Sequence, residues 1–95
     1  MMQTIQANNA APAKVGTLGI SYPRIPSDVF PYSRRQAEID VATLGWLAFQ
    51  DRDRLELLSH EDETWSVFDV LVGDAVSEDA ISAYEAIYDA AKELL

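Results

Sequence analysis

The sequence predicts a mostly α-helical fold, a small single-domain bundle of three to four helices that carries an extended proline-rich N-terminal arm. A chain of 95 residues with 48% hydrophobic and 24% charged residues has the size and composition of one folded globular domain. Capping signals and helical spacing of apolar residues recur in the second half of the chain. We therefore divide it into a flexible tail (1–13), an extended arm (14–32) and an acidic helical domain (33–95).

The N-terminal third lacks helical signals. Residues 1–13 are polar and without periodicity, which is typical of a mobile tail. Residues 14–20 could form a short strand that two glycines weaken. The following stretch contains three prolines, which remove amide donors and restrict their neighbours, so we expect an extended segment. This segment is expected to pack as a loop on its own domain. The alternative is a partner-binding segment anchored by Tyr22, Phe30 and Tyr32.

The first helix is expected to begin at Ser33, because Ser33 and Gln36 have capping-box spacing. Apolar residues then recur at helical spacing, at Ala37, Val41, Leu44 and Ala48. Gly45 in the middle indicates either close packing by a neighbouring element or a break in the helix. The "LELL" stretch after this helix is expected to extend it or to form a second short one.

The stretch 64–72 is compatible with a helix or with a strand. Its valines and aromatic residues favour a strand, whereas Trp65, Phe68 and Val72 have helical spacing and Gly73 suits a C-terminal cap. We favour the helix. If 64–72 and 14–20 are both strands, the fold class becomes α+β.

The C-terminal helix has the strongest local signals. Ser77 is expected to cap it, with Val76 and Ile81 as a hydrophobic staple and acidic residues in its first turn. Its expected apolar stripe consists of Ile81, Tyr84, Ile87, Tyr88, Ala91, Leu94 and Leu95.

Charge and composition exclude several classes of protein. The net charge is −9 and the pI is about 4.2, which argues against direct contact with nucleic acid or an anionic membrane. The charge is uneven, since residues 36–95 hold 15 acidic residues against three basic ones. Cysteine is absent, so disulfides, thiolate zinc sites and thiol catalysis are excluded. We expect a cytoplasmic protein.

The stretch "SHEDETW" (59–65) holds the single histidine of the chain, three consecutive acids and a tryptophan. A zinc protease helix needs a second histidine four residues after the first, and Thr64 stands there instead of histidine. We find neither a nucleophile elbow nor a phosphate-binding glycine loop. The sequence therefore predicts no catalytic residues, no metal and no cofactor. We expect "HEDE" to begin a helix that carries Trp65 into the core.

The acidic residues are the remaining candidate site. We expect them to offer an anionic surface to a larger protein whose basic surface normally holds nucleic acid, with the three arm aromatics as anchors. The expected partner-binding acids are Glu61, Asp62, Glu63, Glu78, Glu85 and Asp89. A solvated face that only keeps the domain soluble is the alternative for any one acidic row.

A small, acidic, cysteine-free chain without a catalytic signature is similar in general character to phage or mobile-element inhibitors such as anti-CRISPR and anti-restriction proteins. The resemblance implies a non-enzymatic inhibitor. The alternative function is a structural or assembly subunit, for instance of a phage particle, that docks through its proline-rich arm. A homodimer is compatible with either function.

Overall fold

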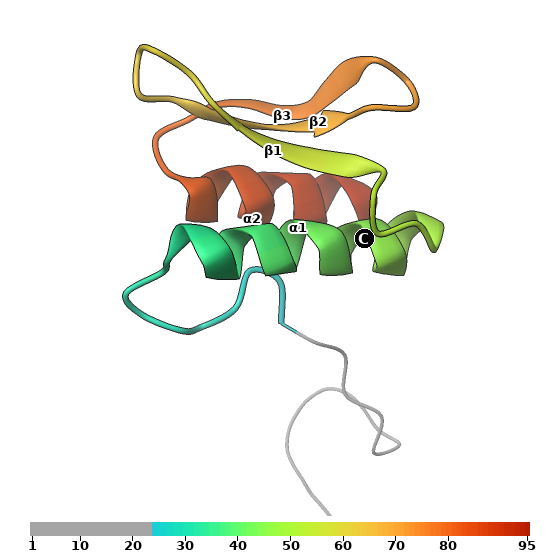
Figure 1. The fold of residues 1–95 in the computed structure, drawn as a ribbon, viewed down its shortest axis with the longest axis horizontal. Coiled ribbons are helices and arrows are strands. Elements are labelled where there is room, and N and C mark those ends of the chain that lie inside the picture. The colour runs from blue at the N-terminus through green and yellow to red at the C-terminus, as the bar shows by residue number, and fades with distance from the viewer. Residues whose placement is uncertain (1–23) are drawn as a thin grey trace, which may run out of the picture.

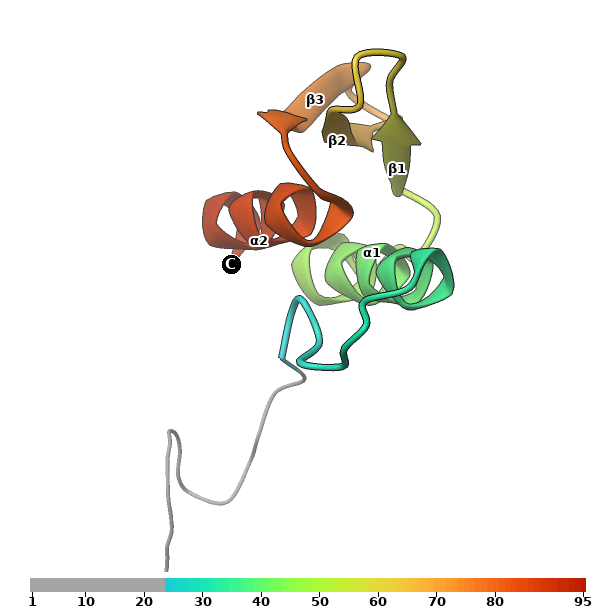
Figure 2. The ribbon, with the colours of Figure 1, turned by 90° about the vertical axis from the view of Figure 1, so that its left-hand side faces the viewer.

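The computed structural model describes residues 24–95, in which two helices pack against one face of a three-stranded antiparallel sheet (Figure 1). In chain order the elements are α1 (Arg34–Phe49), β1 (Leu55–Ser59), β2 (Trp65–Asp69), β3 (Asp74–Ala80) and α2 (Ala83–Leu94). Both helices lie on the same side of the sheet, and no element within residues 24–95 covers its other face (Figure 2). The predicted helical bundle is therefore wrong, and the fold is α+β. The possible strand at 14–20 and the tail lie outside the described residues.

Helix α1 begins as the sequence predicts. The Ser33 hydroxyl accepts a hydrogen bond from the backbone N–H of Gln36 at 3.0 Å, which satisfies one of the free amides of the first turn. The helix runs unbroken through Gly45 and ends where Gln50 adopts a left-handed conformation. The Asp51 amide then donates to the Gly45 carbonyl, so the chain turns back directly against the helix.

The segments 55–59 and 65–69 are strands rather than helices. They pair in an unshifted antiparallel register that sets Leu57 opposite Val67. These two residues and Leu55 point toward the helices and are buried. Their neighbours Leu58 and Phe68 point to the other face. The prediction of a helix over 64–72 is wrong because residues 65–69 pair with a strand on each side, as the central strand of the sheet.

The expected start of the C-terminal helix at Ser77 is also wrong. Ser77 lies in β3, where its hydroxyl donates to the Ala86 carbonyl at 2.8 Å. The residue that caps α2 is Ser82, which accepts from the Glu85 amide at 3.1 Å. Ile81 lies before the helix and is 80% exposed, so the expected staple does not form. A second capping pair, Ser82 with Glu85, stands five to eight residues after Ser77. The helix therefore starts later, and 74–80 is free to pair with β2.

The core lies between the sheet and the two helices. It is built from small and medium side chains, mainly alanines on the helices and leucine or valine on the strands: Ala37, Val41, Leu44, Leu55, Leu57, Val67, Ala80, Ala86, Ile87, Ala90 and Ala91. Alanine-rich helix faces let both helices approach the sheet closely. Tyr88 and Leu95, which the sequence assigns to the apolar stripe of α2, are exposed instead.

Residues 24–32 fold back onto α1 through Asp40. This carboxylate is 2% exposed and accepts four hydrogen bonds. Ser27 donates two of them, from its amide and its hydroxyl, both at 2.8 Å. The Tyr32 phenol donates at 2.6 Å and the Gln36 side-chain amide at 3.0 Å. The described part of the arm therefore packs as a loop on its own domain.

The turn between β2 and β3 is held by Asp69. Its carboxylate accepts from the Arg54 guanidinium at 2.9 and 3.0 Å and from the amides of Leu71 and Val72 at 3.1 and 3.2 Å. The guanidinium also lies 3.6 Å from the centre of the Phe49 ring. The hydrogen bonds from Arg54 lower the pKa of Asp69, with the two amides adding to the effect. One carboxylate thus ties the turn to the end of α1.

The Asp69→Asn variant is expected to change how stability depends on pH. A carboxyl group whose pKa is lowered by folding contributes stability above its unfolded pKa of about 3.9 and loses it as pH falls through the folded value. The variant should therefore have a lower free energy of unfolding than the original chain at pH 7, and this difference should disappear as the pH falls from 5 to strongly acidic values. Urea unfolding over a pH series measures this. A gap of constant size at every pH would contradict the role assigned to Asp69.

Candidate binding face on the open side of the sheet

The "SHEDETW" stretch forms the turn between β1 and β2, so its assignment as a helix start is wrong. The His60 amide donates to the Thr64 carbonyl at 2.9 Å, and the Glu63 amide donates to the His60 carbonyl at 3.0 Å. Glu63 has a positive φ of 68°, which matches hairpin loops that close through one left-handed residue. Trp65 still packs against the core, but it does so as the first residue of a strand.

Asp62 stabilises this turn. Its Oδ1 accepts from the Thr64 hydroxyl at 2.6 Å and from the Thr64 amide at 3.1 Å. These hydrogen bonds favour the ionised carboxylate and lower its pKa, the hydroxyl having the larger effect. The turn therefore presents a fixed negative charge to solvent.

Beside this turn, the outer face of the sheet forms a shallow hollow of about 680 Å³. Leu58, Phe68 and Ala75, one from each strand, give it an apolar centre. Acidic residues from the β1–β2 turn and from β3 surround that centre: Glu61, Asp62, Asp74, Glu78 and Asp79. None of the lining residues is lysine or arginine. We call this feature the acidic hollow.

The single histidine lies at the edge of the acidic hollow. His60 Nε2 lies 2.8 Å from the hydroxyl of Ser66, the distance of a hydrogen bond. Ser66 is only 6% exposed. Within residues 24–95, no side chain hydrogen-bonds the second ring nitrogen of His60, so the pair lacks the orienting group of a catalytic triad. The contact fixes the histidine against β2.

The structure divides the acids that the sequence groups together. Glu61, Asp62 and Glu78 line the acidic hollow, whereas Glu63 lies in the turn outside it. Glu85 and Asp89 belong to α2, which covers the opposite face of the sheet (Figure 2). Both also have local partners. Glu85 accepts a hydrogen bond from the Ile81 amide at 3.0 Å, and Asp89 forms an ion pair with Lys92 at 3.7 Å.

The arm aromatics lie on the helix layer, away from the acidic hollow. The rings of Phe30 and Tyr32 have their centres 5.7 and 5.2 Å from that of Tyr84 on α2. Burial raises the pKa of Tyr32, and its hydrogen bond to Asp40 raises the pKa further. Phe30 remains 67% exposed. Tyr22 lies outside the described residues.

Sequence reasoning assigned neither the apolar centre of the acidic hollow, such as Leu58 and Phe68, nor the acids Asp74 and Asp79 to a binding surface. The available signal was alternation: in "LELLS" and "WSVFD", read as paired strands, every second residue faces away from the helices. Within 24–95, no group of three or more potential ligands is placed to hold a metal ion. No helix in the same range is long and apolar enough to cross a membrane.

Comparison of the chain with known protein families, with curated proteins and with solved structures finds no match. The candidate site therefore rests on the geometry of the described residues.

Proposed function

We propose that the protein is a non-enzymatic binding module whose acidic hollow docks on a basic surface of a larger protein. The observation that carries this proposal is the composition of the open sheet face: an apolar strip, Leu58 with Phe68, inside a ring of carboxylates with no lysine or arginine among the lining residues. Protein interfaces commonly combine a desolvated apolar centre with a polar rim. Here the rim has a single sign of charge.

The apolar centre supplies affinity that charge alone would not. Leu58 and Phe68 are both half-buried in the free protein, so covering what remains exposed would contribute about 1 kcal/mol for each side chain. The surrounding carboxylates would steer a cationic partner and fix its orientation, an effect that salt screens.

A partner that normally holds nucleic acid fits this charge pattern. The body of the chain carries 15 acidic residues against three basic ones, and neighbouring strands place side chains about 5 Å apart. Duplex DNA is denser, with one charge for about every 1.7 Å of axis. Competition with nucleic acid would therefore depend on the apolar centre as well. This supports an inhibitor, of the anti-CRISPR or anti-restriction kind in general character, as the biological role.

Reversing charge in the acidic hollow is the direct test. Glu61 and Glu78 have exposed side chains without a hydrogen-bond partner among the described residues. The double variant Glu61→Lys, Glu78→Lys should fold and should lose binding by about tenfold or more, because it places two cations against a basic partner. The measurement begins with capture of proteins from host lysate at low salt and their identification by mass. The retained proteins are then assayed for release of bound nucleic acid.

Asp89→Lys with Glu93→Lys is the matched control, since it makes the same charge change on α2, at the exposed Glu93 and the partly exposed Asp89. The control should retain binding. Equal losses in both variants would mean that only net charge matters. Binding that resists both salt and the hollow variant, but is lost on Phe30→Ala, would favour the assembly subunit that docks through its arm.

A further inference from the structure

Three consecutive aliphatic side chains are exposed in the turn between β2 and β3. Val70, Leu71 and Val72 are 47%, 73% and 66% exposed, and Gly73, which follows them, has a positive φ of 79°. Turns usually carry glycine, proline, asparagine, aspartate or serine. A run of exposed apolar residues is a liability for a soluble domain unless it serves a function. We call Val70, Leu71 and Val72 the apolar tip.

The fold holds the apolar tip in place without using its side chains. The Asp69 carboxylate accepts from the amides of Leu71 and Val72, and the Asp69 carbonyl accepts from the Gly73 amide at 2.8 Å. The Val70 amide donates to the carbonyl of the residue before β1 at 3.0 Å. All of these donors are backbone amides, so polar side chains at the tip would permit the same bonds. The turn therefore does not explain why these residues are apolar.

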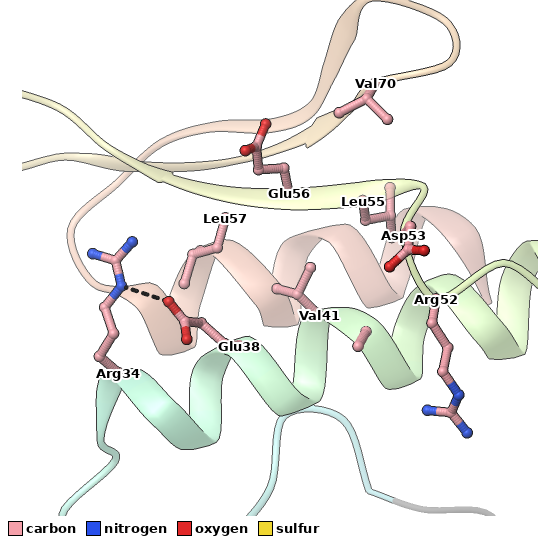
Figure 3. Close-up of a pocket in the computed structure, with 10 residues that line it drawn as sticks. Arg34, Glu38, Val41, Arg52, Asp53, Leu55, Glu56, Leu57 and Val70 are labelled. Carbon is pink, nitrogen blue, oxygen red and sulfur yellow. Dashed lines mark hydrogen bonds and ion pairs between the residues drawn. The ribbon is translucent and has the colours of Figure 1, made fainter.

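The members of the apolar tip differ in their surroundings. Val70 lies on the β1 side of the turn, where it lines a groove of about 400 Å³ together with Asp53 and Leu55 (Figure 3). Leu71 and Val72 are more exposed, and they lie beyond the last pair of the β2–β3 ladder. These two side chains therefore form the convex end of the hairpin, a shape that fits a pocket better than a flat surface.

The apolar tip adjoins the acidic hollow. Phe68 and Ala75, which pair in the ladder, both line the hollow, as does Asp74 directly after the turn. The β1–β2 turn, which supplies Glu61 and Asp62, lies at the opposite end of the sheet (Figure 1). The acidic hollow thus extends along the outer face from one turn to the other, with the tip at its end.

Charge indicates what kind of surface covers the apolar tip. Asp74 is exposed beside it, and the rest of the acidic hollow adds four acids without lysine or arginine. A cationic protein surface complements these acids. A second copy of the chain would bring its own acids against them, and an anionic membrane would repel a net charge of −9. The tip and the hollow therefore fit the same basic partner.

We propose, on the basis of the proposed function, that the basic partner has an apolar pocket that receives Leu71 and Val72 while its cationic residues meet the acidic hollow. Covering the two aliphatic side chains removes apolar surface from water, a contribution that salt does not screen. A turn that is already formed loses little conformational freedom on binding. The tip therefore slows dissociation, whereas the acids of the hollow speed association.

Site-specific photo-crosslinking of the full chain in host lysate tests whether the two features share a partner. p-Benzoylphenylalanine replaces Leu71 in the tip, Glu78 in the acidic hollow, or Tyr88 on α2 as the control. Positions 71 and 78 are expected to crosslink to one protein that position 88 does not reach. The peptide joined to position 71 should be apolar, and the one joined to position 78 should contain lysine or arginine. Crosslinks from position 71 to lipid, to a second copy, or to a different protein from position 78 would overturn the proposal.

Binding kinetics of the protein crosslinked from position 78, once purified, test the role of the tip. The double variant Leu71→Ser, Val72→Thr should dissociate about tenfold faster or more at low and at high salt, with its association rate unchanged. The matched control is Ile81→Ser with Val29→Thr, which makes the same kinds of change at residues that are 80% and 54% exposed outside the turn. Both rates of the control should equal those of the original chain.

The kinetics also separate this inference from the proposed function. If the tip variant dissociated as slowly as the original chain, insertion of the tip would be wrong, and loss of binding in Glu61→Lys, Glu78→Lys would still support the proposed function. If the tip variant alone lost affinity, insertion of the tip would be supported, and the proposed role of the acids would fail.

Discussion

Replacement of Asp40 by alanine is expected to lower the free energy of unfolding by about 3 kcal/mol, the cost of leaving several partly buried donors without a partner. The lost carboxylate accepts four hydrogen bonds that attach residues 24–32 to α1. For a domain of this size the thermal midpoint should fall by about 15 °C. Urea and thermal unfolding followed by circular dichroism measure both quantities.

Tyr32→Phe is the graded control for this prediction. It removes one of the four hydrogen bonds and keeps the ring against Tyr84, so it should cost about 1 kcal/mol. If Asp40→Ala lowered the free energy of unfolding by less than about 1 kcal/mol, residues 24–32 would contribute little to the fold. There would then be no reason to treat them as part of the domain.

Gly45→Ala is expected to destabilise the protein by about 2 kcal/mol, although the same change in an ordinary helix interior stabilises by about 1 kcal/mol. A Cβ on Gly45 would lie 2.5 Å from the backbone carbonyl oxygen of Asp51. The obstacle is the backbone of the returning chain, so a change of side-chain rotamer cannot relieve the clash. The clash would push the turn before β1 away from α1.

Thr43→Ala is the matched control on the same helix. Its side chain is partly exposed and donates only to the Ile39 carbonyl one turn before it, and alanine has the higher helix propensity, so a gain of a few tenths of a kcal/mol is expected. Urea unfolding of both variants under the same conditions gives the comparison. If Gly45→Ala stabilised the chain as Thr43→Ala does, the close approach of Asp51 to α1 would be wrong.

Helix α1 could be predicted because its signals are local. Ser33 and Gln36 mark its start within four residues, and Gly45 indicated the close packing that Asp51 provides. The acidic character of the body also follows from the sequence alone.

The strands could not be predicted because local signals compete there. "VSEDAI" has a serine and two acids where a helix N-terminus needs them, but "ISAYE" offers the same cap five residues later. The choice between them depends on whether 74–80 can pair with β2, which is a contact between distant residues. The position of "HEDE" in a hairpin follows from the same pairing.

Only part of the candidate site could be predicted, for the same reason. Glu61, Asp62 and Glu78 were identified as acids, but their common surface depends on the sheet. Glu85 and Asp89 have helical spacing with Glu78 only if the helix begins at Ser77. Because it begins at Ala83, Glu78 lies on the outer face of the sheet and the other two on α2.

The measurement that tests the proposed binding face most directly is an NMR titration of the protein with a partner purified by low-salt capture. Side-chain signals of Leu58 and Phe68, at the centre of the acidic hollow, are expected to shift and broaden, while those of Tyr88 on α2 stay unchanged. Shifts confined to α2 or to Phe30, with Leu58 and Phe68 unaffected, would contradict the assignment of the open sheet face as the binding surface.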